Sequence, residues 1–150
     1  MKRWYLLIFL LAAGALFAPA RAGAASYPRI ASGSPGFTAT IIAMGLEDHL
    51  VAVSRFCTLP DRLAHLPRVA DAQNVDGETL MAAKPDVVLT QIQDPARYAG
   101  LQKIDPNVRV IYISVETIDD IGTSMLTIGE IVGKQADAEV LYAAWQERIA

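Results

Sequence analysis

Short apolar runs alternate with longer segments of mixed polarity along most of this chain. Four runs are short, mostly apolar and bounded by charged residues, Gly, Pro or Asp, which is typical of buried strands. They cover residues 29–32, 50–54, 87–90 and 108–114. The spacing of apolar positions predicts helices between and after them, at residues 37–44, 76–83, 94–101, 117–132 and 134–150.

Capping residues mark the ends of several predicted helices. Asp94 followed by Pro95 supplies an N-cap acceptor and a proline at the first helical position. Thr117 and Asp120 have the spacing of a capping box, with Asp in place of Glu, and Gly133 is placed to end that helix. Residues 55–74 show little periodicity and contain two prolines, so we expect mainly loop there with one helical turn.

Strands that alternate with helices favour βαβ units, in which right-handed crossovers place helices on both faces of a parallel sheet. The predicted fold class is therefore α/β, an open parallel sheet flanked by helices. We expect an α/β lobe to span residues 25–133, and residues 134–150 to form the start of a further helix.

The first 24 residues have the pattern of a cleaved secretory signal peptide. Two positive charges at Lys2 and Arg3 precede an apolar run at residues 6–17, and small residues follow with the spacing of a cleavage site. A retained membrane anchor is the alternative, but the apolar run is shorter than the roughly 20 residues that span a bilayer. The pattern predicts export to the periplasm.

Charge and cysteine content exclude other classes. The formal net charge is −3, and residues 25–150 hold no cluster of Lys and Arg, which argues against a nucleic-acid partner. Cys57 is the only cysteine, so the fold is not held by an intramolecular disulfide. A small buried hydrophobic side chain is the simplest interpretation of Cys57.

The carboxyl ends of the predicted strands carry the candidate binding residues. Ligands of open parallel sheets bind beyond these ends. The candidates there are Ser34, Pro35, Gly36, Phe37, Arg55, Phe56 and Gln91. Two aromatic rings, a guanidinium and amides suit a flat, partly apolar ligand with polar edges or carboxylates.

The same positions do not favour catalysis. We find no pairing of a nucleophile with a base, and His49 and His65 are isolated in the sequence. Residues 33–36 are not a phosphate-binding loop, because Pro35 removes a backbone N–H donor. We therefore predict no catalytic residues, no metal ligands and no cofactor.

Five segments follow one another along the chain: PRIASGSP, AMGLEDHLVAVS, FCTLP, LPRV and ETLMAAKPDVVL. In order and spacing they resemble the motifs of the periplasmic binding proteins that deliver cobalamin, haem or ferric siderophores to ABC transporters. The match departs from the family pattern at Gly33, Ala39 and Ala70.

The resemblance implies a two-lobed protein that holds a metal chelate between lobes joined by a long helix. It implies that Glu78 docks onto an arginine of the ABC permease, and that Phe56 and Gly36 face the ligand. Residues 134–150 would begin the joining helix, so we expect the sequence to be a fragment without the second lobe. The sequence leaves two alternatives open, an extracellular sensing lobe of a signalling protein and an α/β enzyme domain.

Overall fold

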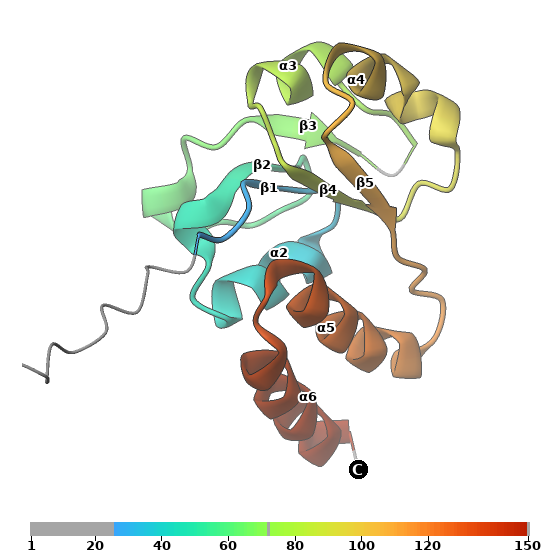
Figure 1. The fold of residues 1–150 in the computed structure, drawn as a ribbon. Helices are drawn as coiled ribbons and strands as arrows, with labels where there is room; N and C mark the ends of the chain where they lie inside the picture. The colour runs from blue at the N-terminus through green and yellow to red at the C-terminus, as the bar shows by residue number, and fades with distance from the viewer. Residues whose placement is uncertain (1–25, 72, 150) are drawn as a thin grey trace, which may run out of the picture.

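The protein forms a five-stranded, fully parallel sheet with helices on both faces (Figure 1). The structure is a computed structural model that describes residues 26–71 and 73–149, so the expected signal peptide lies outside the described residues. The strands are β1 (Ile30–Ser32), β2 (Leu50–Ser54), β3 (Arg68–Ala70), β4 (Val87–Thr90) and β5 (Arg109–Tyr112). Their order is β3-β2-β1-β4-β5, which confirms the predicted fold class.

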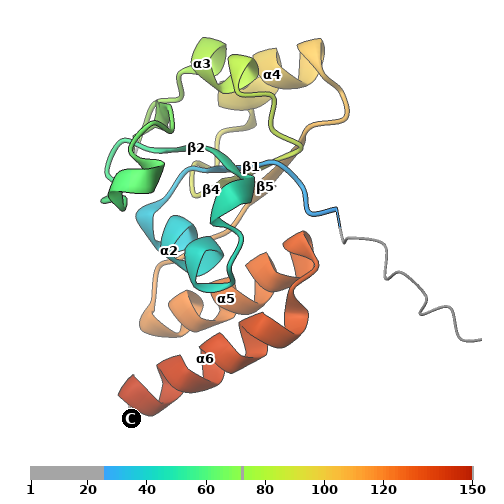
Figure 2. The ribbon, with the colours of Figure 1, turned by 90° about the vertical axis from the view of Figure 1, so that its left-hand side faces the viewer.

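The helices form one layer on each side of the sheet (Figures 1 and 2). One layer contains α2 (Pro35–Ala43) and α5 (Ile118–Val132), and α6 (Gln135–Ile149) packs on α5 on the side away from the sheet (Figure 2). The other layer contains α3 (Gly77–Ala82) and α4 (Ala99–Ile104). Side chains alternate along each strand, so each face buries its own core. Ile30 belongs to the core under α2 and α5, whereas the next residue, Ala31, belongs to the core under α3 and α4.

The predicted helix caps are present. Asp76 accepts a hydrogen bond from the backbone N–H of Thr79 at 3.0 Å at the start of α3. Thr117 and Asp120 form the complete capping box of α5. Gly133 ends α5 with a φ of 75°, a left-handed conformation that suits glycine.

The structure adds one strand to the prediction and shifts the bounds of several elements. The sheet has five strands rather than four, because β3 lies within residues 55–74, which were expected to be mainly loop. The expected helical turn in the same segment is present at Asp61–Leu63. β3 is a three-residue edge strand, too short to produce a periodic pattern. Helix α2 begins at Pro35 rather than at residue 37. The helix capped by Asp94 starts as a 3-10 turn (Pro95–Tyr98) and continues as α4 to Ile104.

Helices α5 and α6 approach each other closely at two glycines of α5. A Cβ atom on Gly129 would lie 2.2 Å from the Cβ of Ala138, and one on Gly122 would lie 2.5 Å from the ring of Trp145. The Trp145 ring stacks with that of Tyr142 at a centroid distance of 5.9 Å. The missing glycine side chains therefore allow α6 to lie against α5 (Figure 2).

Candidate functional site

The candidate site lies where the carboxyl ends of the central strands meet. β1 connects through α2 to β2 on one side, and β3 connects through α3 to β4 on the other side of β1. The connections therefore diverge between β1 and β4, the position at which open α/β sheets bind ligands. The loops that follow these two strands carry five of the predicted site residues: Ser34, Pro35, Gly36, Phe37 and Gln91.

Gly33 brings the loops after β1 and β4 into contact. Its N–H donates to the carbonyl of Leu89 at 2.8 Å, and a Cβ at this position would lie 2.9 Å from the same oxygen. A larger residue would push the two strand ends apart, because the obstructing atom belongs to the backbone of β4. The departure from the family pattern at Gly33 thus has a local physical reason.

The four predicted residues after β1 occupy different depths. Pro35 and Gly36 are exposed at the first turn of α2, whereas Ser34 is buried. Phe37 is only 1% exposed, so its ring packs in the core between the sheet and α2 rather than projecting into solvent. Phe37 nevertheless lines the hollow between α2 and α5, so its contact with a ligand stays a prediction.

The loop after β2 presents Arg55 and Phe56 to solvent, and the Phe56 side chain is 63% exposed. Arg68 on β3 holds this loop: its Nη1 donates to the carbonyl of Cys57 at 2.6 Å and to that of Ser54 at 3.3 Å. Sequence reasoning does not identify Arg68 as a site residue. A basic residue inside a short apolar strand is the only sequence signal for it.

Cys57 is buried beneath the same loop, as expected for a small hydrophobic side chain. Its sulfur lies 3.2 Å from the Oγ1 of Thr38 on α2. Thr38 in turn donates to the Oγ of Ser32 at 2.8 Å. This buried polar chain connects the end of β1, the first turns of α2 and the loop after β2.

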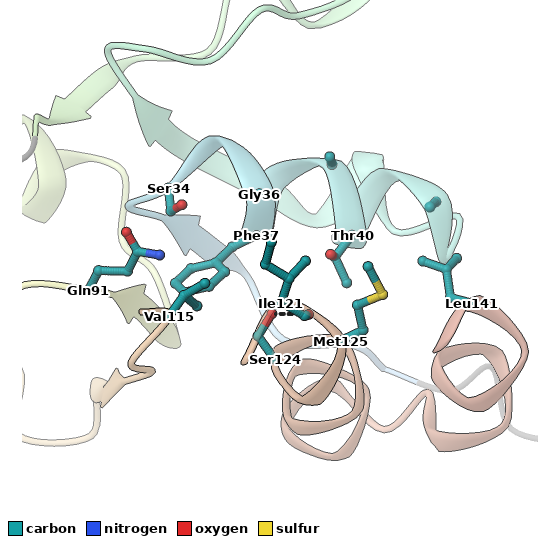
Figure 3. Close-up of a pocket in the computed structure, with 12 residues that line it drawn as sticks. Ser34, Gly36, Phe37, Thr40, Gln91, Val115, Ile121, Ser124, Met125 and Leu141 are labelled. Carbon is teal, nitrogen blue, oxygen red and sulfur yellow. Dashed lines mark hydrogen bonds between the residues drawn. The ribbon is translucent and has the colours of Figure 1, made fainter. Parts of the chain in front are cut away.

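One hollow along this edge, of about 450 Å³, lies between α2 and the pair α5 and α6. Figure 3 shows Ser34 and Gln91 at one end and Leu141 at the other. Between them, Thr40 of α2 and Met125 of α5 line the hollow from opposite sides. Its walls are mostly apolar, with Ser34 and Gln91 at the end nearest the strand ends and the hydroxyl groups of Thr40 and Ser124 farther along.

A second apolar hollow of about 450 Å³ lies on the other side of α2. Phe56 forms one wall, and Pro35, Ala39 and Ile42 of α2 form another. Since Pro35 begins α2 and Phe56 lies in the loop after β2, the fold brings these two predicted site residues together.

A third hollow, of about 330 Å³, is polar. It shares Gln91 and Val115 with the first hollow and extends past the ends of β4 and β5. Its polar lining comprises Asp71, Gln91, Gln93, Tyr112, Ser114 and Glu116. The backbone N–H groups of Gln73 and Asn74 donate to Asp71, which holds the pKa of its carboxyl below the usual value and keeps it ionised.

The remaining predicted residues lie outside these three hollows. Arg55 does not line them, although its charge contributes to lowering the pKa of both Asp71 and Asp76. Glu78 is exposed on α3, in the other helix layer. Tyr98 is buried and its hydroxyl donates to Thr90 at 2.7 Å, so its ring packs inside the fold.

Two general features bear on the class of site. Within residues 26–71 and 73–149, no group of three or more His, Cys, Asp and Glu side chains has the geometry to hold a metal ion. Over the same described residues, every helix is too short or too polar to cross a bilayer.

Known proteins with similar sequences and folds identify the family to which this chain belongs. A vitamin B12-binding protein from Pectobacterium atrosepticum is 26% identical over 121 residues, which cover 81% of this chain and 43% of the relative. The periplasmic haem-binding protein of Vibrio cholerae is 27% identical with a TM-score of 0.71, covering 81% of this chain and 47% of that one.

The periplasmic vitamin B12-binding protein of Vibrio cholerae is 25% identical with a TM-score of 0.67, covering 82% of this chain and 48% of that one. The chain thus spans less than half the length of the curated relatives it matches. The sequence model described as "Periplasmic binding protein" matches residues 30–150, almost the whole of the part the structure describes. The chain therefore belongs to the periplasmic binding protein family.

Proposed function

We propose that this chain binds a metal chelate (cobalamin, haem or a ferric siderophore) as one lobe of the periplasmic component of an ABC importer. The observation that carries the proposal is the arrangement of hollows at the carboxyl edge of the sheet. Two apolar hollows lie on either side of α2, and a polar one adjoins the first of them. A large chelate with an apolar macrocycle or shell and polar substituents has both kinds of surface.

The relatives support this class of ligand. Two similar proteins are named for vitamin B12 and one for haem, and each match covers about four fifths of this chain. The family model covers residues 30–150, which include all residues that line the three hollows. In this proposal, the chain acts by binding rather than by catalysis, in the periplasm, and the expected signal peptide directs it there. The ligand lies between the carboxyl edge of this sheet and a second lobe that the residues from 134 onward lead toward.

Exposure of Phe56 fits such a role. An aromatic side chain left mostly in solvent loses the free energy that burial would provide, about 2 kcal/mol for a ring of this size. A flat ligand that covers the ring recovers that free energy on binding. Anchoring of the loop by Arg68 then positions the ring beforehand, which reduces the entropy lost on binding.

The test is a titration of the isotopically labelled chain followed by NMR, which detects weak binding to a single lobe. Cyanocobalamin, haem and a ferric siderophore are added separately. We expect one class to shift or broaden the backbone signals of residues 34–37, 55–56 and 91, with most other signals unaffected. No perturbation by any of the three, or perturbation only on the side of α3 and α4, would remove the proposal.

We further propose that Glu78 docks the protein onto an arginine of the permease. Its carboxylate is exposed in the first turn of α3, where Asp76 and Thr79 hold the helix start. A carboxylate at such a position is accessible to a guanidinium, which binds carboxylates through two parallel hydrogen bonds. Because α3 does not line the three hollows, docking and ligand binding use different surfaces.

Glu78→Ala is expected to reduce uptake by cells that carry the importer and to leave chelate affinity unchanged. Glu139→Ala is the matched control, since Glu139 is also an exposed helical carboxylate but lies on α6. Equal loss of uptake in both variants, or loss of affinity in Glu78→Ala, would contradict the docking role.

A further inference from the structure

The polar hollow beyond β4 and β5 carries two carboxylates from distant parts of the sequence. Asp71 follows β3, and Glu116 lies between β5 and α5. The fold places both in the wall of one hollow, together with the amides of Gln91 and Gln93. Position along the chain did not indicate this pairing.

Hydrogen bonds within the hollow leave it rich in acceptors. The backbone N–H groups of Gln73 and Asn74 donate to Oδ1 of Asp71 at 2.9 and 2.7 Å. The Ser114 hydroxyl donates to Oε1 of Glu116 at 3.2 Å. These hydrogen bonds engage Oδ1 of Asp71 and Oε1 of Glu116, and each carboxylate has a second oxygen that can accept from a ligand.

Arg55 does not reverse this charge. From the sequence alone, its guanidinium suggests an attraction for ligand carboxylates. In the structure, Arg55 lies outside the hollow, and its field acts on the carboxylates of Asp71 and Asp76. The single positive charge of Arg55 is thus shared between the carboxylates of Asp71 and Asp76. Glu116 adds a further negative charge in the wall of the hollow.

We infer that the polar hollow selects, among metal chelates, those whose periphery bears hydrogen-bond donors such as carboxamide, hydroxyl or ammonium groups, and rejects those that bear carboxylates. The inference rests on the proposed function, because the hollow adjoins the proposed chelate site. Donor groups on the ligand can bind the second carboxylate oxygens of Asp71 and Glu116, whereas a ligand carboxylate is repelled by their negative charges. Charged acceptors form stronger hydrogen bonds than neutral ones, which makes the selection effective.

The size of the effect follows from Coulomb's law. Like charges a few ångströms apart in a water-accessible hollow repel only modestly, because the high dielectric constant of water weakens their interaction. Two carboxylates of the protein, partly offset by Arg55, should therefore weaken binding of each ligand carboxylate about fivefold at low salt. At about 1 M salt, where the Debye length is about 3 Å, most of the difference should vanish, which a steric cause would not produce.

The experiment uses pairs of chelates that share a metal and a core and differ only in peripheral charge. The pairs are cyanocobalamin and its derivative with one carboxamide hydrolysed to a carboxylate, haem with its propionates amidated and unmodified haem, and a ferric trihydroxamate with a free amine and its succinylated form. Dissociation constants are measured by NMR titration of the full chain. We expect the member without carboxylates to bind about fivefold more tightly or better.

Asp71→Asn combined with Glu116→Gln should abolish this preference by strengthening binding of the carboxylate member. The amide introduced at position 71 retains an oxygen that can accept hydrogen bonds from the backbone. Glu116→Gln alone should halve the logarithm of the ratio of the two dissociation constants. Asp48→Asn is the matched control, because exposed Asp48 lies just before β2 at the opposite edge of the sheet.

Each outcome decides between the two ideas. If chelates bind but the carboxylate members bind equally or more tightly, the inference is wrong and the proposed function stands. The inference is also wrong if the preference persists in the double variant or in high salt. If no chelate of any pair binds, the proposed function fails, and the inference fails with it.

Discussion

Replacing Gly129 by alanine should separate α6 from α5. In an isolated helix this substitution stabilises by about 1 kcal/mol, because alanine has the higher helix propensity. Here the new Cβ would lie 2.2 Å from the Cβ of Ala138 and 3.0 Å from the carbonyl of Lys134. Carbon atoms in contact prefer about 3.5–4.0 Å, so the helices must move apart by more than about 1 Å at this point.

Overpacking of this kind costs about 3 kcal/mol, which exceeds the gain in propensity and leaves a net loss of about 2 kcal/mol in the free energy of unfolding. For a domain of this size, that loss lowers the melting temperature by roughly 6–10 °C. Chemical and thermal unfolding followed by circular dichroism measure both quantities. The α6 amides should also exchange hydrogen faster, because α6 contacts the rest of the chain mainly through α5.

Two further variants isolate the cause. Gly100→Ala on α4 is the control, because a Cβ there meets nothing within 4 Å and should stabilise the protein. Ala138→Gly in the Gly129→Ala background removes the main clash and should recover part of the loss, although the contact with Lys134 remains. The reasoning is refuted if Gly129→Ala is as stable as the unmodified protein, or if Ala138→Gly only adds to the loss.

Three other outcomes follow from the structure. Phe56→Ala should leave stability nearly unchanged, because the ring is 63% exposed, but should weaken chelate binding in the NMR titration; a large loss of stability would contradict its exposure. Arg68→Ala removes the donors to Cys57 and Ser54 and should increase hydrogen exchange in residues 55–58 and weaken binding, whereas unchanged exchange would show that the loop is held otherwise. Backbone and side-chain hydrogen bonds from Thr79 hold the pKa of Asp76 below its usual value, so its contribution to stability is present above the unfolded pKa and is lost as pH falls through the folded pKa. Asp76→Asn should therefore weaken the decline in stability measured in acid below about pH 4, and an identical acid profile would count against this cap.

Local signals in the sequence predicted the elements whose causes are local. The Asp94-Pro95 start and the capping box of Thr117 and Asp120 depend on residues three or fewer apart, and both are present. Strand β3 was not predicted, because its three residues form no apolar run or alternating pattern and its register is set by pairing with β2. Phe37 is a similar case in the candidate site. Its position after β1 could be predicted from the sequence, but its burial depends on the packing of α2 against the sheet.

The order of apolar and polar positions, by itself, determined the α/β class, the helix caps and the edge of the sheet at which a site should lie, because those follow from hydrogen bonding and burial within short segments. Only the tertiary structure decided how that edge is divided. Gly33 contacts Leu89, Phe56 lines a hollow with α2, and Asp71 and Glu116 line one hollow although they follow strands at opposite ends of the sheet. The charge of the polar hollow is therefore a property of the folded sheet, where Arg55 acts on Asp71 and Asp76 from outside that hollow.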